Sequence, residues 1–242
     1  MEKDLNNKIE DFRSKVTQAG EEIPLTRFPS GLTELIQTTN NPESPFHISH
    51  AVQATDTTIY PPPSALPTVD EPKFKKRKLE NNTTDTMQCT RSASHVSANK
   101  HMVEKVHGIV KKESEELAAY IDQVKLWVTL TLPKIEDGDN FGVQIQEEVL
   151  GELHRGQESA YNIRDASRQD YIARAKICSK LIKYPNIEDY KLALIEHDNK
   201  QLYLARQHLC DLRNVYAVLT DLIHKNISKI RAPKANNSVG LY

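Results

Sequence analysis

Apolar residues recur every three or four positions along much of the chain, the spacing that places them on one face of an α-helix. The longest uninterrupted series lies in residues 187–230, a stretch without Gly or Pro. Its apolar face consists of Leu202, Ala205, Leu209, Leu212, Tyr216, Leu219 and Ile223. The alternating steps of three and four predict a helix-bundle seam. At ~1.5 Å per residue this helix is on the order of 65 Å long, and it needs packing partners because long single helices are unstable in water.

Two more helices are predicted upstream of it. Residues 98–132 have the same spacing, through Val103, Val106, Val110, Leu117, Tyr120, Val124 and Trp127. Residues 143–184 have it through Val149, Leu153, Ala160, Ile163, Ile177 and Leu181. Pro185 ends this helix, because proline lacks an amide donor and disfavours helical angles at the preceding residue. Asn186 is then the predicted N-cap of the last helix.

The first 40 residues show a weaker helical pattern. The face formed by Ile9, Phe12 and Val16 is interrupted by Pro24 and Pro29. Apolar residues then resume at Leu32, Leu35 and Ile36. The segment is therefore either one kinked helix or two short ones. Together the patterns predict an all-α protein: an antiparallel four-helix bundle of long helices, with residues 1–40 as its first helix and residues 98–231 as the other three.

Residues 41–97 break the pattern. Seven of the twelve prolines lie here, together with many Ser and Thr residues, and no apolar period is present. Such a segment cannot bury enough apolar surface to offset its ordering entropy. We therefore expect a disordered, exposed insert between the first and second helices. Its densest run of charge is Lys75, Lys76, Arg77 and Lys78.

This basic cluster has two interpretations. A run of charged side chains can be no more than a solvated surface, but basic residues on an accessible, extended backbone are also what a nuclear-import signal requires. The second interpretation is favoured and predicts a protein of the nucleus, with the cytoplasm as a further compartment. Nucleic-acid binding is not expected, because four positive charges neutralise few phosphates and the whole chain has a formal net charge of -1.

Composition and motifs exclude several classes of protein. The start of the chain is charged and lacks the apolar region of a signal peptide, and no apolar run approaches the ~20 residues that cross a membrane. The three cysteines are too dispersed for a zinc site or a disulfide framework. No phosphate-binding glycine loop, metalloprotease motif or nucleophile elbow occurs. We therefore expect no enzyme activity, no cofactor and no metal.

The histidines do not alter this expectation. Those in the second and fourth predicted helices are His101, His107, His197, His208 and His224. None of them lies four residues from another ligand on the same helix, which is the spacing that would bring two ligands to one metal ion. We expect these side chains at the surface or at an interface.

The connection at residues 133–143, PKIEDGDNFGV, is richer than a simple helix connector needs to be. Pro133 ends the second helix and sets the direction of the loop. Gly138 and Gly142 permit backbone angles that other residues avoid. Three acidic side chains offer acceptors to amide groups and cations. Phe141 is expected to anchor the far end of the loop in the bundle.

Three stretches of the sequence resemble the 11S proteasome activators, and in particular their gamma type. They are residues 126–153 (LWVTLTLPKIEDGDNFGVQIQEEVLGEL), 171–190 (YIARAKICSKLIKYPNIEDY) and 211–234 (DLRNVYAVLTDLIHKNISKIRAPK). The basic cluster also lies where gamma-type members have a nuclear signal, and the alternating Lys/Glu run of the alpha-type insert is absent. The resemblance covers residues 98–242 strongly and residues 1–40 weakly.

The resemblance implies a subunit of a homo-oligomeric, heptameric ring that caps the 20S proteasome and opens it without ATP. Its activation loop would press on the proteasome α-subunits and open their gate. In this chain the loop comprises Ile135, Glu136, Asp137, Gly138, Asp139, Asn140, Phe141, Gly142 and Val143. A free C-terminal tail, residues 232–242, would insert between α-subunits. Its binding residues would be Val239, Gly240, Leu241 and Tyr242.

Three points stay open from the sequence. Asp139 stands where the mammalian-type members have Asn, and a carboxylate cannot donate the hydrogen bond that an amide can. Gly240 stands where a bulkier polar residue is expected. The aromatic residues outside the seam face either the bundle core or a neighbouring subunit: Trp127, Tyr161, Tyr171, Tyr190 and Tyr203. The alternative function is a coiled-coil scaffold or adaptor that binds partner helices through the same bundle.

Overall fold

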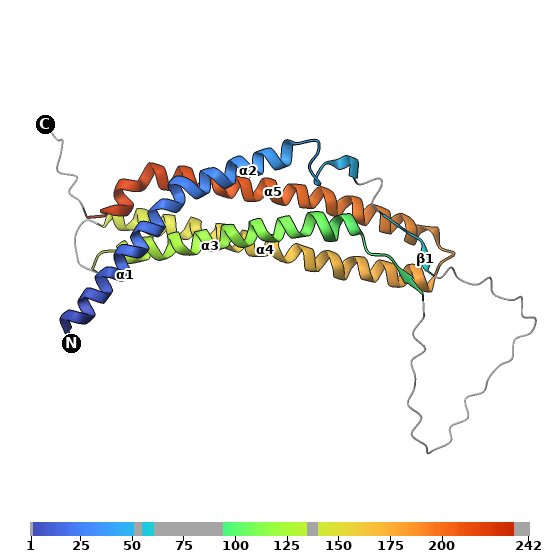
Figure 1. Ribbon diagram of the computed structural model, residues 1–242, viewed down its shortest axis with the longest axis horizontal. Coiled ribbons are helices and arrows are strands. Elements are labelled where there is room, and N and C mark those ends of the chain that lie inside the picture. Colours follow the sequence, from blue (N-terminus) through green and yellow to red (C-terminus); the bar gives the residue numbers. More distant parts are fainter. Residues whose placement is uncertain (1, 51–54, 61–93, 135–139, 235–242) are drawn as a thin grey trace, which may run out of the picture.

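The computed structural model describes residues 2–50, 55–60, 94–134 and 140–234. Four long helical segments lie side by side in alternating directions (Figure 1). They are α1 (Glu2–Glu22), which continues through η1 (Ile23–Arg27) into α2 (Phe28–Asn40); η3 (Met102–Val106), which continues into α3 (His107–Thr131); α4 (Phe141–Lys183); and α5 (Glu188–Arg231). The predicted all-α, antiparallel four-helix bundle is confirmed.

The first segment is one kinked helix rather than two separate helices. The π-helical turn η1 joins α1 to α2, and Pro24 lies in its first positions. Proline removes an amide donor from the ladder, and this is an established cause of a kink. Beside the kink, a Cβ on Gly20 would lie 2.2 Å from Cβ of Trp127. Only a residue without a side chain permits so close an approach of the two helices.

The first half of α1 diverges from the bundle (Figure 1). Ile9 and Phe12 do share a face, but that face is exposed: the two residues expose 40% and 51% of their surface. Val16 is the first residue of the series to pack against the core. The helical period therefore continues further toward the N-terminus than the helix–helix contacts do.

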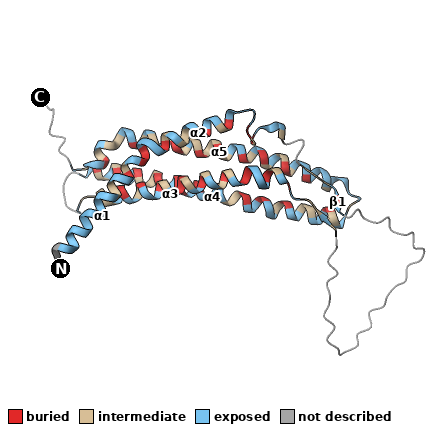
Figure 2. Ribbon diagram, in the orientation of Figure 1, coloured by how far each residue is buried: buried red, intermediate tan, exposed pale blue. Residues whose placement is uncertain are grey.

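The core is one continuous apolar cluster that runs between the four segments (Figure 2). All seven residues of the α5 seam are buried, and Trp127 is completely buried, so it belongs to the core rather than to an interface. Tyr161, Tyr171 and Tyr203 are exposed. Val103 is wrong as a core prediction. It lies in the π-helical η3, which holds more than 3.6 residues per turn, so Met102 rather than Val103 aligns with Val106.

Both ends of the predicted insert, residues 41–97, are ordered and packed, so the expectation of a structureless segment is wrong there. Phe46 is buried in the main core, just before the short helix η2 (Ile48–His50). The strand β1 (Ile59–Tyr60) pairs antiparallel with β2 (His95–Val96), with Ile59 opposite Val96. Ile59 also packs in a second small cluster with Leu181 and Leu194 of the bundle. These few apolar residues hold the two ends in place because they bury apolar surface, which the polar residues around them lack.

The turn between α4 and α5 differs in one detail from its prediction. The amide of Ile187 donates to the carbonyl of Tyr184 at 3.1 Å, so Pro185 and Asn186 form the centre of a reverse turn. The N-cap residue of α5 is Ile187, without a side-chain capping bond. Asn186 is therefore a turn residue and not the predicted cap, because the turn closes one residue later than the sequence pattern suggests.

Candidate functional site

The predicted loop and the predicted tail leave from the same end of the bundle (Figure 1). Helix α3 ends at Thr131 and α4 begins at Phe141, while α5 ends at Arg231 and the chain continues to Lys234. Of the nine predicted loop residues, the structure describes Asn140, Phe141, Gly142 and Val143. Residues 135–139, the tail residues 239–242 and the basic cluster 75–78 lie outside the described residues.

The start of α4 packs directly against the chain that leaves α5. Gly142 is buried, and a Cβ there would lie 2.1 Å from the carbonyl oxygen of Pro233. The prediction assigned Gly142 to backbone freedom, whereas its position inside the first turn of α4 shows that close approach is what it provides. Phe141, which we expected to anchor the far end of the loop, is 56% exposed and does not belong to the buried core.

Gln146, one turn further along α4, connects three helix ends. Its side chain is completely buried, and its Nε2 atom donates to the carbonyl oxygen of Ile230 at 2.8 Å. The same atom lies 3.2 Å from Oγ1 of Thr131 and 3.4 Å from its carbonyl oxygen. The last carbonyls of a helix lack partners within the helix, so these bonds satisfy groups at the ends of both α3 and α5.

Gln146 is not among the site residues predicted from the sequence, although the sequence contains a signal for it. It lies three residues before Val149 and seven before Leu153, so it continues the apolar stripe of α4 with a polar residue. A polar side chain at a core position of a helix needs a hydrogen-bond partner inside the protein. The stripe identifies the position, but only the fold identifies the partners.

An ion pair adds the first helix to this end of the bundle. The guanidinium of Arg231 contacts both carboxylate oxygens of Glu21, at 3.2 Å and 3.1 Å. Both side chains are partly exposed to water. Such a pair contributes little to the free energy of folding, but its two-point geometry orients the end of α5 relative to α1.

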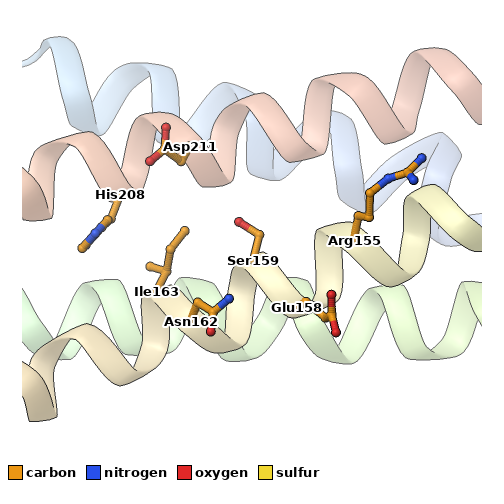
Figure 3. Close-up of a pocket in the computed structure, with 7 residues that line it drawn as sticks. All are labelled: Arg155, Glu158, Ser159, Asn162, Ile163, His208 and Asp211. Atoms are coloured by element: carbon orange, nitrogen blue, oxygen red, sulfur yellow. The ribbon is translucent and has the colours of Figure 1, made fainter.

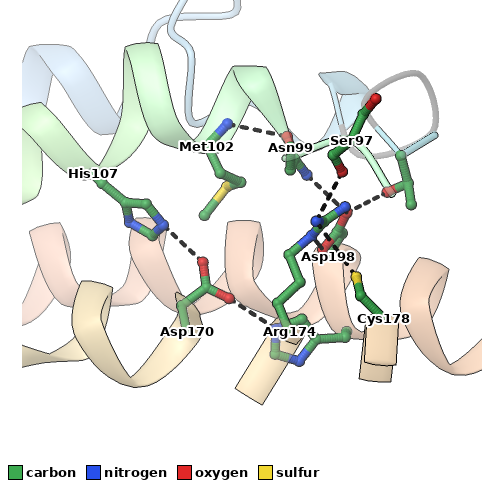
Figure 4. Close-up of polar contacts among 10 residues, drawn as sticks. Ser97, Asn99, Met102, His107, Asp170, Arg174, Cys178 and Asp198 are labelled. Carbon is green, nitrogen blue, oxygen red and sulfur yellow. Dashed lines mark hydrogen bonds and ion pairs between the residues drawn. The ribbon is translucent and has the colours of Figure 1, made fainter. Parts of the chain in front are cut away.

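The other half of the bundle contains a buried polar cluster (Figure 4). Nε2 of His107 lies 2.7 Å from one carboxylate oxygen of Asp170, and Nε2 of His197 lies 2.8 Å from the other. Burial raises the pKa of Asp170, but the hydrogen bonds from the two imidazoles outweigh it and lower the pKa to about 2. His107 is buried between helices, so the prediction that places it at the surface or at an interface is wrong.

A second buried carboxylate, Asp198, extends the cluster. It forms an ion pair with Arg174 at 3.0 Å and accepts hydrogen bonds from Asn99 at 3.0 Å and from Thr55 at 2.9 Å. Arg174 also donates to the carbonyl oxygen of Ser97 at 3.0 Å. Because Thr55 and Ser97 belong to the two ends of the insert, the cluster fastens both ends to α4 and α5.

An open groove of about 480 Å³ lies between α4 and α5 (Figure 3). Its lining is mostly polar: Arg155, Glu158, Ser159, Asn162, Ile163, His208 and Asp211. Ser159 and His208, both of which the structure describes, have no hydrogen bond to each other across this groove. Among the described residues, no cluster of three or more His, Cys, Asp or Glu side chains suits a metal ion, and no described helix is long and apolar enough to cross a membrane.

Comparison with known proteins identifies the class to which this fold and its loop-and-tail end belong. A family model, "Proteasome activator PA28, C-terminal", matches residues 95–240. The chain is 35% identical over 246 residues to proteasome activator complex subunit 3 of Gallus gallus, which covers 97% of this chain and 95% of the relative. It is 34% identical over 253 residues to the protein of that name in Homo sapiens, over 100% and 98% of the two chains. The chain therefore belongs to the PA28 family of proteasome activators.

Solved structures agree with this assignment. The 11S subunit PA28 of the Plasmodium falciparum proteasome has a TM-score of 0.74 and 29% sequence identity, over 96% of this chain and 95% of that chain. An activator complex of the archaeal 20S proteasome has a TM-score of 0.59 and 11% identity, and that likeness shows the fold alone.

Proposed function

We propose that this protein is an ATP-independent cap of the 20S proteasome, which docks through its C-terminal tails and opens the α-ring gate with the loop at residues 135–143. Membership of the PA28 family supports activation as the function. The observation that supports this division of labour is the arrangement at one end of the bundle. There the loop and the tail emerge together, and Gln146 and the Gly142–Pro233 contact hold their bases in contact.

The tail suits capture by its carboxylate, which is a recurring mode of peptide recognition. One short tail binds weakly, but several tails on one ring raise the effective concentration of each further contact, so that avidity exceeds a single affinity by ~10² or more. The loop then acts by a shift of populations. The open form of the α-ring is favoured because it is the form that fits the loop.

This mechanism needs a ring, and we propose a heptamer of this chain. Several large apolar side chains on the outside of α1, α4 and α5 are exposed in the single subunit and are available for such contacts: Leu5, Phe12, Tyr161, Leu192, Tyr203 and Val218. The proposal assigns no catalytic residue, cofactor or metal to this chain, since peptide hydrolysis occurs in the proteasome. The cluster Lys75–Lys78 supports import into the nucleus.

The direct test is to add the purified protein to latent 20S proteasome from the same source and to follow hydrolysis of small fluorogenic peptides without ATP. We expect a rise in rate that saturates with activator concentration. Light scattering should give the mass of a ring of several 27.5 kDa subunits. A single subunit at working concentration, or no rise with a cognate proteasome, would contradict the proposal and favour a scaffold protein instead.

A loop variant separates binding from activation. Asp139→Tyr places a bulky side chain in the proposed activation loop and leaves the tail unchanged. We expect the variant to bind the proteasome as the natural chain does and to raise the peptidase rate little or not at all. If binding and activation fall together, the loop and the tail do not have separate functions.

A further inference from the structure

We propose that Gln146 and Gly142 are positioning residues. They hold the base of the tail and the two bases of the loop in one fixed geometry. When the tails dock on the proteasome, the loop therefore has one fixed position relative to the α-subunits. This inference rests on the proposed function of the loop and the tail. It adds Gln146, which lies outside the proposed loop, a buried contact of Gly142 at the end of that loop, and a physical link between docking and gate opening.

Gln146 is an unusual residue for its site. It is completely buried in the stripe that continues with Val149 and Leu153, where an apolar side chain of the same volume would bury no polar atom of its own but would leave the carbonyl of Ile230 without this donor. Its Oε1 atom has no hydrogen-bond partner among the described residues. A buried amide with an unsatisfied acceptor is unfavourable for folding and calls for another explanation. The explanation offered by the structure is the Nε2 donor, which is directed at the ends of α3 and α5.

A glycine at position 142 is likewise unfavourable for the stability of helix α4. Glycine in a helix is less stable than alanine, because it loses more backbone entropy on folding. Gly151 in the same helix has open space around the position of a Cβ, whereas a Cβ on Gly142 would lie within 2.1 to 2.7 Å of three backbone atoms of Pro233. The absent side chain at Gly142 therefore serves one contact, between the first turn of α4 and the start of the tail.

Together, the contacts of Gln146 and Gly142 connect both ends of the loop with the start of the tail. Thr131 is the last residue of α3 before the loop, Gly142 lies at the end of the loop in the first turn of α4, and Ile230 and Pro233 lie on either side of the start of the tail. Direct contacts of Gln146 and Gly142 connect all of these positions, with no flexible segment between them. A force on the base of the tail therefore reaches both bases of the loop, and a change of either contact displaces these bases relative to one another.

The test uses two variants, each with a matched control in the same helix. Gln146→Met keeps the length of the side chain and removes the donor, and Gln144→Met makes the same exchange two residues earlier at an exposed position. Gly142→Ala adds a methyl group against Pro233, and Gly151→Ala adds it in open space. Each purified protein is titrated onto latent 20S proteasome, and binding to immobilised proteasome is measured in parallel.

The plateau of the titration is the decisive quantity. A variant that only folds less well lowers the concentration of competent rings, so its curve shifts to higher concentration but reaches the same plateau. A loop held in the wrong register lowers the plateau itself. Because a displacement of about 1 Å in a positioned group can reduce a rate ~10²-fold, we expect the plateau of Gln146→Met and Gly142→Ala to fall about tenfold or more. Binding and the plateau of both controls should stay within about twofold of the natural chain.

The alternatives are distinguishable. If the natural chain does not activate the proteasome, the proposed function fails. If it activates and both variants bind and reach its full plateau, the positioning inference is wrong while the function stands. If the variants no longer bind the proteasome at all, the residues act in folding or docking, and the inference is also wrong.

Discussion

At the end of the bundle that receives the insert, the helices are joined through charge. Two carboxylates, Asp170 and Asp198, are buried there among two imidazoles and one guanidinium. At the loop-and-tail end, the buried connections are neutral: one amide donor and one close backbone contact. The ion pair at that end, Arg231 with Glu21, is partly exposed. Helix termini are therefore held together at both ends, by buried ionic contacts at the insert end and by neutral buried contacts at the loop-and-tail end.

This difference has a physical consequence. A buried ion pair contributes to uniqueness of structure, but removal of one partner leaves a charge in the protein interior at great cost. A neutral amide bonded to backbone carbonyls keeps the same charge at every pH at which the protein is folded. The buried connection between the bases of the loop and the tail is thus independent of ionisation, whereas the buried cluster at the insert end contains ionisable groups. The following variants test that contrast.

The largest effect is expected from Asp198→Asn. The exchange keeps the size of the side chain and leaves Arg174 buried without its carboxylate, which should lower the free energy of unfolding by about 3–5 kcal/mol. Denaturant unfolding at a fixed subunit concentration measures it. Asp165→Asn is the control, since Asp165 pairs with Arg168 at the surface of α4, and little change is expected there. Equal losses in the two variants would show that the buried pair has no special role.

Deletion of residues 239–242 affects the opposite end. We expect binding to the 20S proteasome to weaken by ~10² or more, because every tail of the ring is removed at once. The melting temperature should change little, because the truncated chain keeps all four helical segments and the core residues between them. Binding to immobilised proteasome and thermal unfolding provide the two measurements. A truncated protein that still binds tightly would place the docking surface elsewhere on the bundle.

The contrast also shows what the sequence could predict. The helical period located all four segments and the complete α5 seam, because burial of an apolar stripe is repeated over many residues and local errors average out. The contacts of two histidines with Asp170 were not predicted, because His107 and His197 lie on different helices and Asp170 lies on a third, so no spacing along one helix relates them. Gly142 was predicted to provide backbone freedom, whereas it provides close approach. Its contact with Pro233 joins positions 91 residues apart in the chain, and only the fold brings them together.

The dependence of stability on pH is a further test of the contrast between the two ends. Asp170 has a pKa of about 2 in the folded protein, below its usual value of 3.8. It therefore contributes stability that is complete above about pH 4 and is lost as the pH falls toward 2. At 1.36 kcal/mol per unit, the contribution is about 2 kcal/mol. Unfolding measured from pH 5 to pH 2 should show this loss in the natural chain and not in Asp170→Asn. Parallel curves for the two proteins would contradict the assignment.

The smallest effect is expected from Glu21→Gln, which breaks the ion pair with Arg231 at the loop-and-tail end. The exchange is the counterpart of Asp198→Asn, because each removes the carboxylate partner of one arginine. Since both side chains of this pair are partly in water, the free energy of unfolding should change by less than about 1 kcal/mol, and by less still at high salt. Peptidase activation should persist, because Gln146 and Gly142 remain in place. A large loss of activation with unchanged stability would instead assign the positioning of the tail to this ion pair, and would move the link between docking and gate opening from the buried amide to the bundle surface.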